Sequence, residues 1–201
     1  MNIIGITGSS GAGKSTVCDI LQKEYDVKVI CADKIAKKLS KRGTTYIEEI
    51  VKNFGDDILD EEGELKRKKL AEIIYTDPQK RKILNKCTFK YIKKEIEKQI
   101  LEENETSTII VDAPLLFECE LDGLCNFVIG IISKRELQIE RIVARDNVDY
   151  EHAEKRLNAQ ESNEFYIQRC DEIIENNDDI FYMEKNVLEL AKKYNITKKL
   201  Q

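Results

Sequence analysis

The feature that most constrains this chain is a short stretch near its start, where an apolar segment leads into residues that are mostly glycine and serine. The apolar segment, Asn2–Thr7, is typical of a short buried strand, and Lys14–Glu24 has the apolar spacing of an amphipathic helix. Between them, Gly8–Ser15 reads G-S-S-G-A-G-K-S, which matches the Walker A pattern G-x-x-x-x-G-K-[ST]. This order of strand, loop and helix favours a phosphate-binding loop over an ordinary glycine-rich turn.

Each part of this loop has a physical role in holding a nucleotide phosphate. Glycines let backbone N–H groups turn toward an anion, and the helix N-terminus adds a favourable dipole. Lys14 would reach the β- and γ-phosphates, and the Ser15 hydroxyl can bind Mg²⁺. The loop alone does not distinguish a kinase from a GTPase or an ATP-driven motor, but the guanine-reading sequence N-K-x-D is absent from the chain.

Strand-like and helix-like segments alternate along the rest of the chain. Val27–Cys31, Thr108–Asp112 and Asn126–Ser133 are continuous apolar runs, as expected for strands that are covered on both faces. The alternation predicts the α/β class, with a doubly wound parallel sheet. A further strand is expected at Glu172–Ile174, and helices at Asp149–Gln160, at Ile180–Tyr194 and around Arg141 and Arg145, where Ser133 and Glu136 have capping-box spacing.

One domain over residues 1–201 is expected, with a helical insertion after the second strand. Residues 34–104 are a string of charged amphipathic helices, and no flexible linker marks their edges. Pro78 follows a break at Asp77 and suits the first turn of a helix. We therefore expect this segment to be a subdomain and not an independent domain.

Composition excludes several classes of protein. A hydrophobic share of 41% and a charged share of 35% describe a soluble globular chain, and the net charge of −5 argues against a general nucleic-acid binder. The longest apolar run, Phe127–Ile132, is too short to span a bilayer. We expect a cytoplasmic protein without a nucleic-acid or membrane partner, as a monomer or weak homo-oligomer. The six cysteines form no C-x-x-C pair and are expected to be free thiols.

A carboxylate follows the second predicted strand. Ligands of open α/β sheets bind at the carboxyl ends of the strands, so Asp33 is expected to face the γ-phosphate and to accept the proton of an attacking hydroxyl. The alternative is that Asp33 caps the next helix. Lys34, Lys38 and Arg42 recur every four residues after it and would form a basic face, which suits a substrate with a pyrophosphate or is an ordinary solvated surface.

Six stretches resemble those of dephospho-coenzyme A kinases in order and spacing, from about Asn2 to Asn177. Enzymes of that family phosphorylate a ribose 3′-hydroxyl with ATP. Walker A is shared by many families, whereas its combination with A-D-x-I-A and P-L-L-F-E is specific. The stretches are GITGSSGAGKST, ADKIAKKL, APLLFE, LQIERIVARD, NAQ and DEIIENN.

The resemblance implies ATP and Mg²⁺ as cofactors, dephospho-coenzyme A as the small-molecule substrate, and a helical lid over about residues 134–165. Asp33 would be the catalytic base, and residues 34–104 would be the coenzyme A subdomain. The implied ATP site comprises Gly8, Gly11, Ala12, Gly13, Lys14, Ser15 and Thr16, the lid residues Arg141, Arg145 and Arg156, and Asn176 with Asn177 near the adenine. The implied substrate contacts are Asp33, Lys34, Arg67 and Leu116, and Asp112 would act on Mg²⁺ through water or else cap its strand.

Two positions depart from the family pattern. Cys31 stands where the family usually has an aspartate, although Asp33 remains. Phe89 and Lys90 stand where a His-Pro pair is common, which puts substrate contacts from that helix in doubt. Another small-metabolite or nucleoside kinase, and a non-catalytic ATP-binding regulator, therefore stay open as alternatives.

Overall fold

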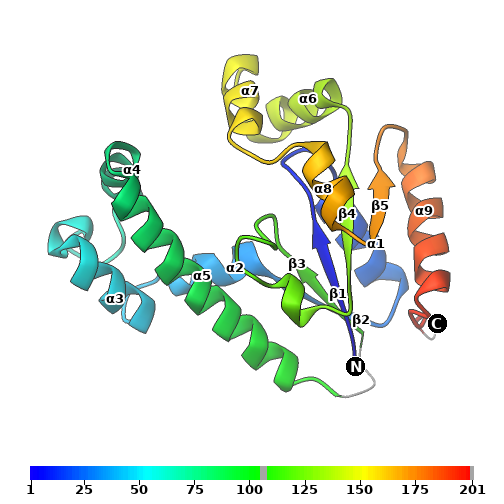
Figure 1. The fold of residues 1–201 in the computed structure, drawn as a ribbon, viewed down its shortest axis with the longest axis horizontal. Helices are drawn as coiled ribbons and strands as arrows, with labels where there is room; N and C mark the ends of the chain where they lie inside the picture. Colours follow the sequence, from blue (N-terminus) through cyan, green and yellow to red (C-terminus); the bar gives the residue numbers. More distant parts are fainter. Residues whose placement is uncertain (105–107, 200–201) are drawn as a thin grey trace. The chain divides into compact units, whose positions relative to one another are not determined.

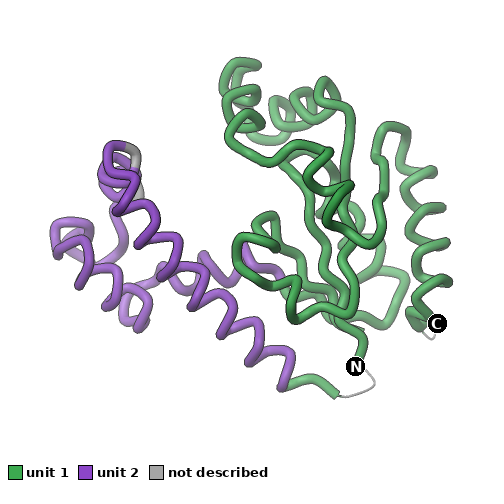
Figure 2. Tube along the Cα trace, in the orientation of Figure 1, with its two compact units in different colours: residues 1–30, 102–201 green, residues 31–101 purple. Residues whose placement is uncertain are grey.

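The computed structural model describes residues 1–104 and 108–199, without the side chains of Arg67 and Tyr75. The chain divides into two compact units, which Figure 2 colours separately. The first comprises Met1–Ile30 and Glu102–Gln201, and the second comprises Cys31–Leu101. The second unit overlaps the insertion that the sequence predicts over residues 34–104. Its role in substrate binding stays a prediction.

Among the described residues, the sheet has five strands in the order β2-β3-β1-β4-β5 (Figure 1). The central strand β1 pairs in parallel with β3 and β4, and β4 pairs in parallel with β5. The carboxyl ends of these four strands therefore meet at one edge of the sheet. The strands are β1 (Asn2–Thr7), β2 (Val27–Cys31), β3 (Thr108–Asp112), β4 (Phe127–Ile132) and β5 (Glu172–Glu175).

Helices cover both faces of this sheet, as the continuous apolar strands predict. Ile4 and Ile6 are fully buried in a cluster with residues of α1 (Lys14–Glu24) and α9 (Ile180–Lys193). On the other face, α8 (Asn163–Arg169) packs against β4 and β5, and Figure 1 shows it in front of β4 with α1 behind. The predicted doubly wound α/β class is confirmed.

The helices α6 (Arg135–Asp146) and α7 (Tyr150–Asn158) form a pair beyond the carboxyl end of β4 (Figure 1). Asp149 caps α7, because its carboxylate accepts a hydrogen bond from the backbone N–H of His152 at 2.8 Å. The capping box predicted for α6 is wrong. Lys134 occupies the N-cap position without a side-chain cap, and the nearby Ser133 hydroxyl instead donates to Asn176 O at 2.6 Å.

The second unit is a set of four α-helices with a small core of its own. Tyr46, Ile47 and Ile50 are buried in it with Leu70 and Cys87. Pro78 occupies the first turn of the longest helix of this unit, as predicted. Asp77, the residue before it, accepts a hydrogen bond from the Lys80 N–H. The helices are α2 (Ala32–Leu39), α3 (Thr45–Phe54), α4 (Arg67–Thr76) and α5 (Pro78–Leu101).

The basic face predicted after Asp33 is shorter than the sequence suggests. α2 ends at Leu39, so Arg42 lies outside the helix, where its backbone N–H donates to Glu64 Oε1 at 3.4 Å. Lys34 and Lys38 remain on α2 and are exposed. The basic residues keep their spacing of four along the sequence, but the helix ends before the last of them.

Two expectations drawn from composition can be compared with the structure. Along the described residues, no helix is both long enough and apolar enough to cross a bilayer. The cysteines are thiols and not disulfides, as expected. Burial raises the pKa of Cys119 and Cys125 to about 12, which keeps both thiols protonated and unreactive at neutral pH.

Candidate active site

The loop between β1 and α1 has the backbone that its glycines allow. Gly8 has φ +142° and Gly13, the N-cap of α1, has φ +107°. A Cβ on Gly8 would lie 2.2 Å from Ile131 O, and one on Gly13 would lie 2.2 Å from Asn176 Nδ2. Both conformation and space therefore exclude side chains here, which leaves the backbone of the loop close to its neighbours.

The loop and the first turn of α1 can bind an anion. α1 begins at Lys14, and the first N–H groups of a helix have no acceptor within the helix. Lys14 Nζ donates to Gly8 O at 2.7 Å, so this side chain folds back across the loop. Ser15 is exposed in the same turn, and Thr16 follows it. The arrangement offers backbone donors, an ammonium group and a hydroxyl to a polyphosphate.

Two glutamines form hydrogen bonds to Ser9 and Ser10 of the loop, and neither was predicted as a site residue from the sequence. Gln138, which is 5% exposed, donates to Ser9 Oγ at 2.6 Å and to Ser10 O at 3.2 Å. Gln160 Oε1 accepts from the Ser10 N–H at 2.8 Å. The available signals were the spacing of Gln138, about one helical turn before Arg141 on α6, and the place of both glutamines in the family-like stretches LQIERIVARD and NAQ.

Arg141 and Asn176 form hydrogen bonds to the middle of the loop. Arg141 Nη1 donates to Gly11 O at 3.1 Å, and its Nη2 donates to Asn176 O at 3.0 Å. Asn176 Nδ2 in turn donates to Ala12 O at 2.8 Å. Burial lowers the pKa of the Arg141 guanidinium. The usual pKa of this group is so high that it stays charged all the same. Contact of these two side chains with a nucleotide stays a prediction.

Arg145 and Arg156 come together from two helices. Both donate to the carboxylate of Asp146, and Arg145 does so with two N–H groups, at 2.8 and 2.9 Å. These hydrogen bonds hold the pKa of the Asp146 carboxyl well below its usual range. Asp146, like the two glutamines, was not among the site residues predicted from the sequence.

The predicted catalytic base lies in the second unit. Asp33 is exposed in the first turn of α2, beside Lys34. The N-cap position is taken by Cys31, with no side-chain cap bond, so the alternative in which Asp33 caps the helix is wrong. The negative charge still interacts favourably with the helix dipole. The side chain of Arg67, at the start of α4, lies outside the described residues.

Asp112 and Leu116 lie close to β1. Asp112 ends β3 and is paired in register with Ile6, two residues before the phosphate loop, and its Oδ1 atom is buried. Leu116 is fully buried, and its Cδ1 atom lies 2.8 Å from where a Cβ on Gly5 would be. Core packing thus explains Leu116 without a ligand, and its predicted substrate contact stays untested.

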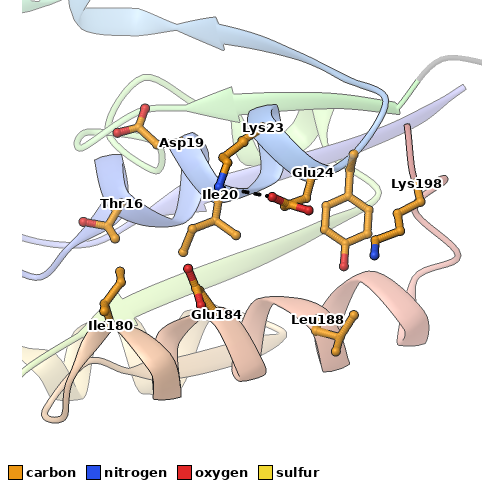
Figure 3. A pocket seen from close by; sticks show the side chains of 10 residues that line it. Thr16, Asp19, Ile20, Lys23, Glu24, Ile180, Glu184, Leu188 and Lys198 are labelled. Carbon is orange, nitrogen blue, oxygen red and sulfur yellow. Dashed lines mark ion pairs between the residues drawn. The ribbon is translucent and has the colours of Figure 1, made fainter. Parts of the chain in front are cut away.

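Two of the cavities that described residues line adjoin the loop. A groove of about 590 Å³ lies between α1 and α9, and Figure 3 shows Thr16 and Ile180 near one end and Lys198 near the other. Of the predicted site residues that the structure describes, Thr16 alone lines this groove. A second cavity, of about 440 Å³, is lined by Ser9 and by both glutamines that hold the loop.

Known proteins are similar to this chain in sequence and in fold. The sequence matches the family described as CoaE, dephospho-CoA kinase, over residues 2–181. A dephospho-CoA kinase of Fusobacterium nucleatum is 40% identical over 185 residues, which cover 92% of this chain and 94% of that protein. The structure of a dephospho-CoA kinase from Campylobacter jejuni is 30% identical, with a TM-score of 0.68 over 96% of each chain. A structure from Thermus thermophilus has a TM-score of 0.81 at 25% identity, and covers 96% of this chain and 97% of its own. This chain belongs to the dephospho-CoA kinase family.

Proposed function

We propose that this protein transfers the γ-phosphoryl group of ATP to the ribose 3′-hydroxyl of dephospho-coenzyme A, which gives coenzyme A and ADP. The observation that carries the proposal is the phosphate loop, with its glycines at positive φ and Lys14 folded back across it, in a chain that matches the family over residues 2–181. Phosphoryl transfer requires mainly positioning and charge stabilisation, and a loop of this kind supplies both.

In this proposal the loop binds the triphosphate. The backbone N–H groups of Gly11–Thr16 surround the phosphates, and Lys14 exchanges its bond with Gly8 O for the β- and γ-phosphate oxygens. Asn176 and Asn177 would lie near the adenine. The three lid arginines, Arg141, Arg145 and Arg156, would balance the charge that develops during transfer.

The donor set around the loop fits Mg²⁺. The described residues contain no group of three or more His, Cys, Asp or Glu side chains that could hold a metal ion alone. Mg²⁺ usually takes one or two protein ligands together with substrate phosphates and water, which suits the Ser15 hydroxyl and, through water, Asp112. When bound, the ion would neutralise charge on the β- and γ-phosphates.

Asp33 is proposed as the general base. Its carboxylate would accept the proton of the 3′-hydroxyl while that oxygen bonds to the γ-phosphorus and the bond from phosphorus to ADP breaks. Lys34 and Arg67 would hold the negative charges of dephospho-coenzyme A. Lys90, at a departure from the family pattern, instead pairs with Glu49 at 2.9 Å within the second unit.

A coupled assay of ATP consumption tests the proposal. Turnover should appear with dephospho-coenzyme A and should be absent with adenosine or uridine, and the product should carry its new phosphate on the 3′-oxygen. Turnover with a nucleoside alone would identify a different small-molecule kinase. ATP binding without turnover of any acceptor would point to a non-catalytic regulator.

The lid over about residues 134–165 gives a prediction of its own. ATP together with dephospho-coenzyme A should slow hydrogen exchange of the backbone from Arg141 to Gln160, because closure would order this segment and exclude water that could itself be phosphorylated. Mass spectrometry of deuterium uptake measures this, with α9 as the internal reference whose exchange should not change. Equal uptake of residues 141–160 with and without both ligands would show that the segment is no lid.

A further inference from the structure

Two arginines assigned to the lid meet at one carboxylate. Arg145 makes a bidentate pair with Asp146, from Nε to Oδ1 at 2.8 Å and from Nη2 to Oδ2 at 2.9 Å. Arg156 Nη1, on α7, also donates to Asp146 Oδ2. Since Asp146 is the last residue of α6, this single side chain joins guanidinium groups from both helices.

The two helices do not depend on this carboxylate for their packing. Apolar side chains of α6 already pack against Ala153 and Leu157 of α7. The turn between them is fixed by Asn147, with φ 52°, and by the Asp149 cap of α7. A role limited to joining α6 to α7 would therefore duplicate contacts that exist without Asp146.

The two guanidinium groups keep N–H donors for a further anion. A guanidinium has five N–H donors, of which Asp146 takes two from Arg145 and one from Arg156. The side chains of Arg145 and Arg156 stay 58% and 43% exposed, while that of Asp146 is 26% exposed. The carboxylate also reduces the repulsion between two neighbouring cations, so they can stay close together before any phosphate arrives.

We infer that Asp146 is a positioning residue, which holds Arg145 and Arg156 at the spacing that the transferred phosphoryl group needs in the transition state. The inference rests on the proposed function, because it gives the two arginines a polyphosphate to contact. Asp146 itself does not touch the substrate. It stays bonded to both arginines while the nucleotide is bound, and their remaining donors face the phosphate oxygens.

The substitution Asp146→Asn keeps the shape of the side chain and removes its charge. We expect kcat to fall about tenfold or more, because the two guanidinium groups lose their fixed spacing. KM for ATP should not rise, because removal of the negative charge strengthens the electrostatic attraction of the two arginines for phosphate. Steady-state kinetics with varied ATP and saturating dephospho-coenzyme A measure both constants, together with a thermal melt.

The matched control is Glu136→Gln, which removes the same charge from the exposed first turn of α6. It should leave kcat and KM unchanged. An unchanged or higher kcat for Asp146→Asn would show that the carboxylate competes with phosphate and does not position the arginines. A higher KM with a lower melting temperature would show a merely structural role. Either result overturns the inference.

A second measurement does not depend on catalysis. Proton NMR of the arginine Nε–H groups should show a slowly exchanging Arg145 signal, identified by its loss in Arg145→Lys. The signal should persist when MgATP binds to the wild-type protein and should be lost in Asp146→Asn. Loss on addition of MgATP to the wild type would show that phosphate displaces Asp146. Since no acceptor is present, this readout separates failure of the inference from failure of the proposed function.

Discussion

Replacement of Asp33 by asparagine should lower the turnover number by roughly 10²-fold or more and leave the affinity for ATP nearly unchanged. Asparagine has almost the same shape as aspartate but cannot take the proton from the 3′-hydroxyl as the new bond to phosphorus forms. Asp33 is exposed and does not cap α2, so its removal disturbs no cap bond. Steady-state rates and a direct ATP titration measure the two effects.

The effect of Asp33→Asn on stability should be small. Its carboxylate lies in the first turn of α2, where interaction with the helix dipole contributes about 0.3–1 kcal/mol. Glu48→Gln is a matched control, because Glu48 is an exposed acidic residue in the first turn of α3. The control should show a similar small loss of stability with normal turnover. Near-normal turnover of Asp33→Asn itself would remove Asp33 from the mechanism.

Gly8→Ala should destabilise the protein and abolish tight ATP binding together. A residue with a Cβ is strained at φ +142° by about 1–3 kcal/mol. The new methyl group would also lie 2.2 Å from Ile131 O, a backbone atom of β4, and overpacking of this kind typically costs about 1–3 kcal/mol more. We therefore expect the free energy of unfolding to fall by about 2–6 kcal/mol. Chemical denaturation and isothermal titration with ATP measure the two losses.

Gly123→Ala is the control for this substitution. Gly123 has no positive φ, and a Cβ there would have no atom within 4 Å in the described chain. Alanine at this position should be neutral or stabilise by up to about 1 kcal/mol, because it restricts the unfolded chain. If Gly8→Ala were as stable as this control and bound ATP normally, the close approach of the loop to β4 would not matter for binding.

The sequence predicted those features that depend on neighbours along the chain. The phosphate loop is specified by eight consecutive residues, and the strands by short apolar runs, so both were correct. Predictions based on spacing alone were less secure. Ser133 has the spacing of a capping residue, yet its hydroxyl bonds to Asn176, 43 positions away. Arg42 continues a period of four, but the helix ends before it.

The parts of the site that could not be predicted depend on tertiary packing. Gln138 supports the loop from 129 positions away, and a glutamine on a charged helix looks like any solvated side chain until the helix is placed. Asp146 follows Arg145 directly, which suggests a local ion pair. Asp146 can bond to Arg156 only because the chain turns at Asn147, between α6 and α7.

The supports of the phosphate loop lie far along the chain, which sets an order of events during synthesis. The loop is synthesised before the side chains that form hydrogen bonds to it, which belong to Gln138, Arg141, Gln160 and Asn176. The central strand β1 likewise waits for β3 and β4 before it has a partner on either side. A nascent chain therefore carries the complete nucleotide-binding motif long before it has a shaped binding site. A chain that ends before Asn176 therefore lacks at least one of the side chains that support the loop.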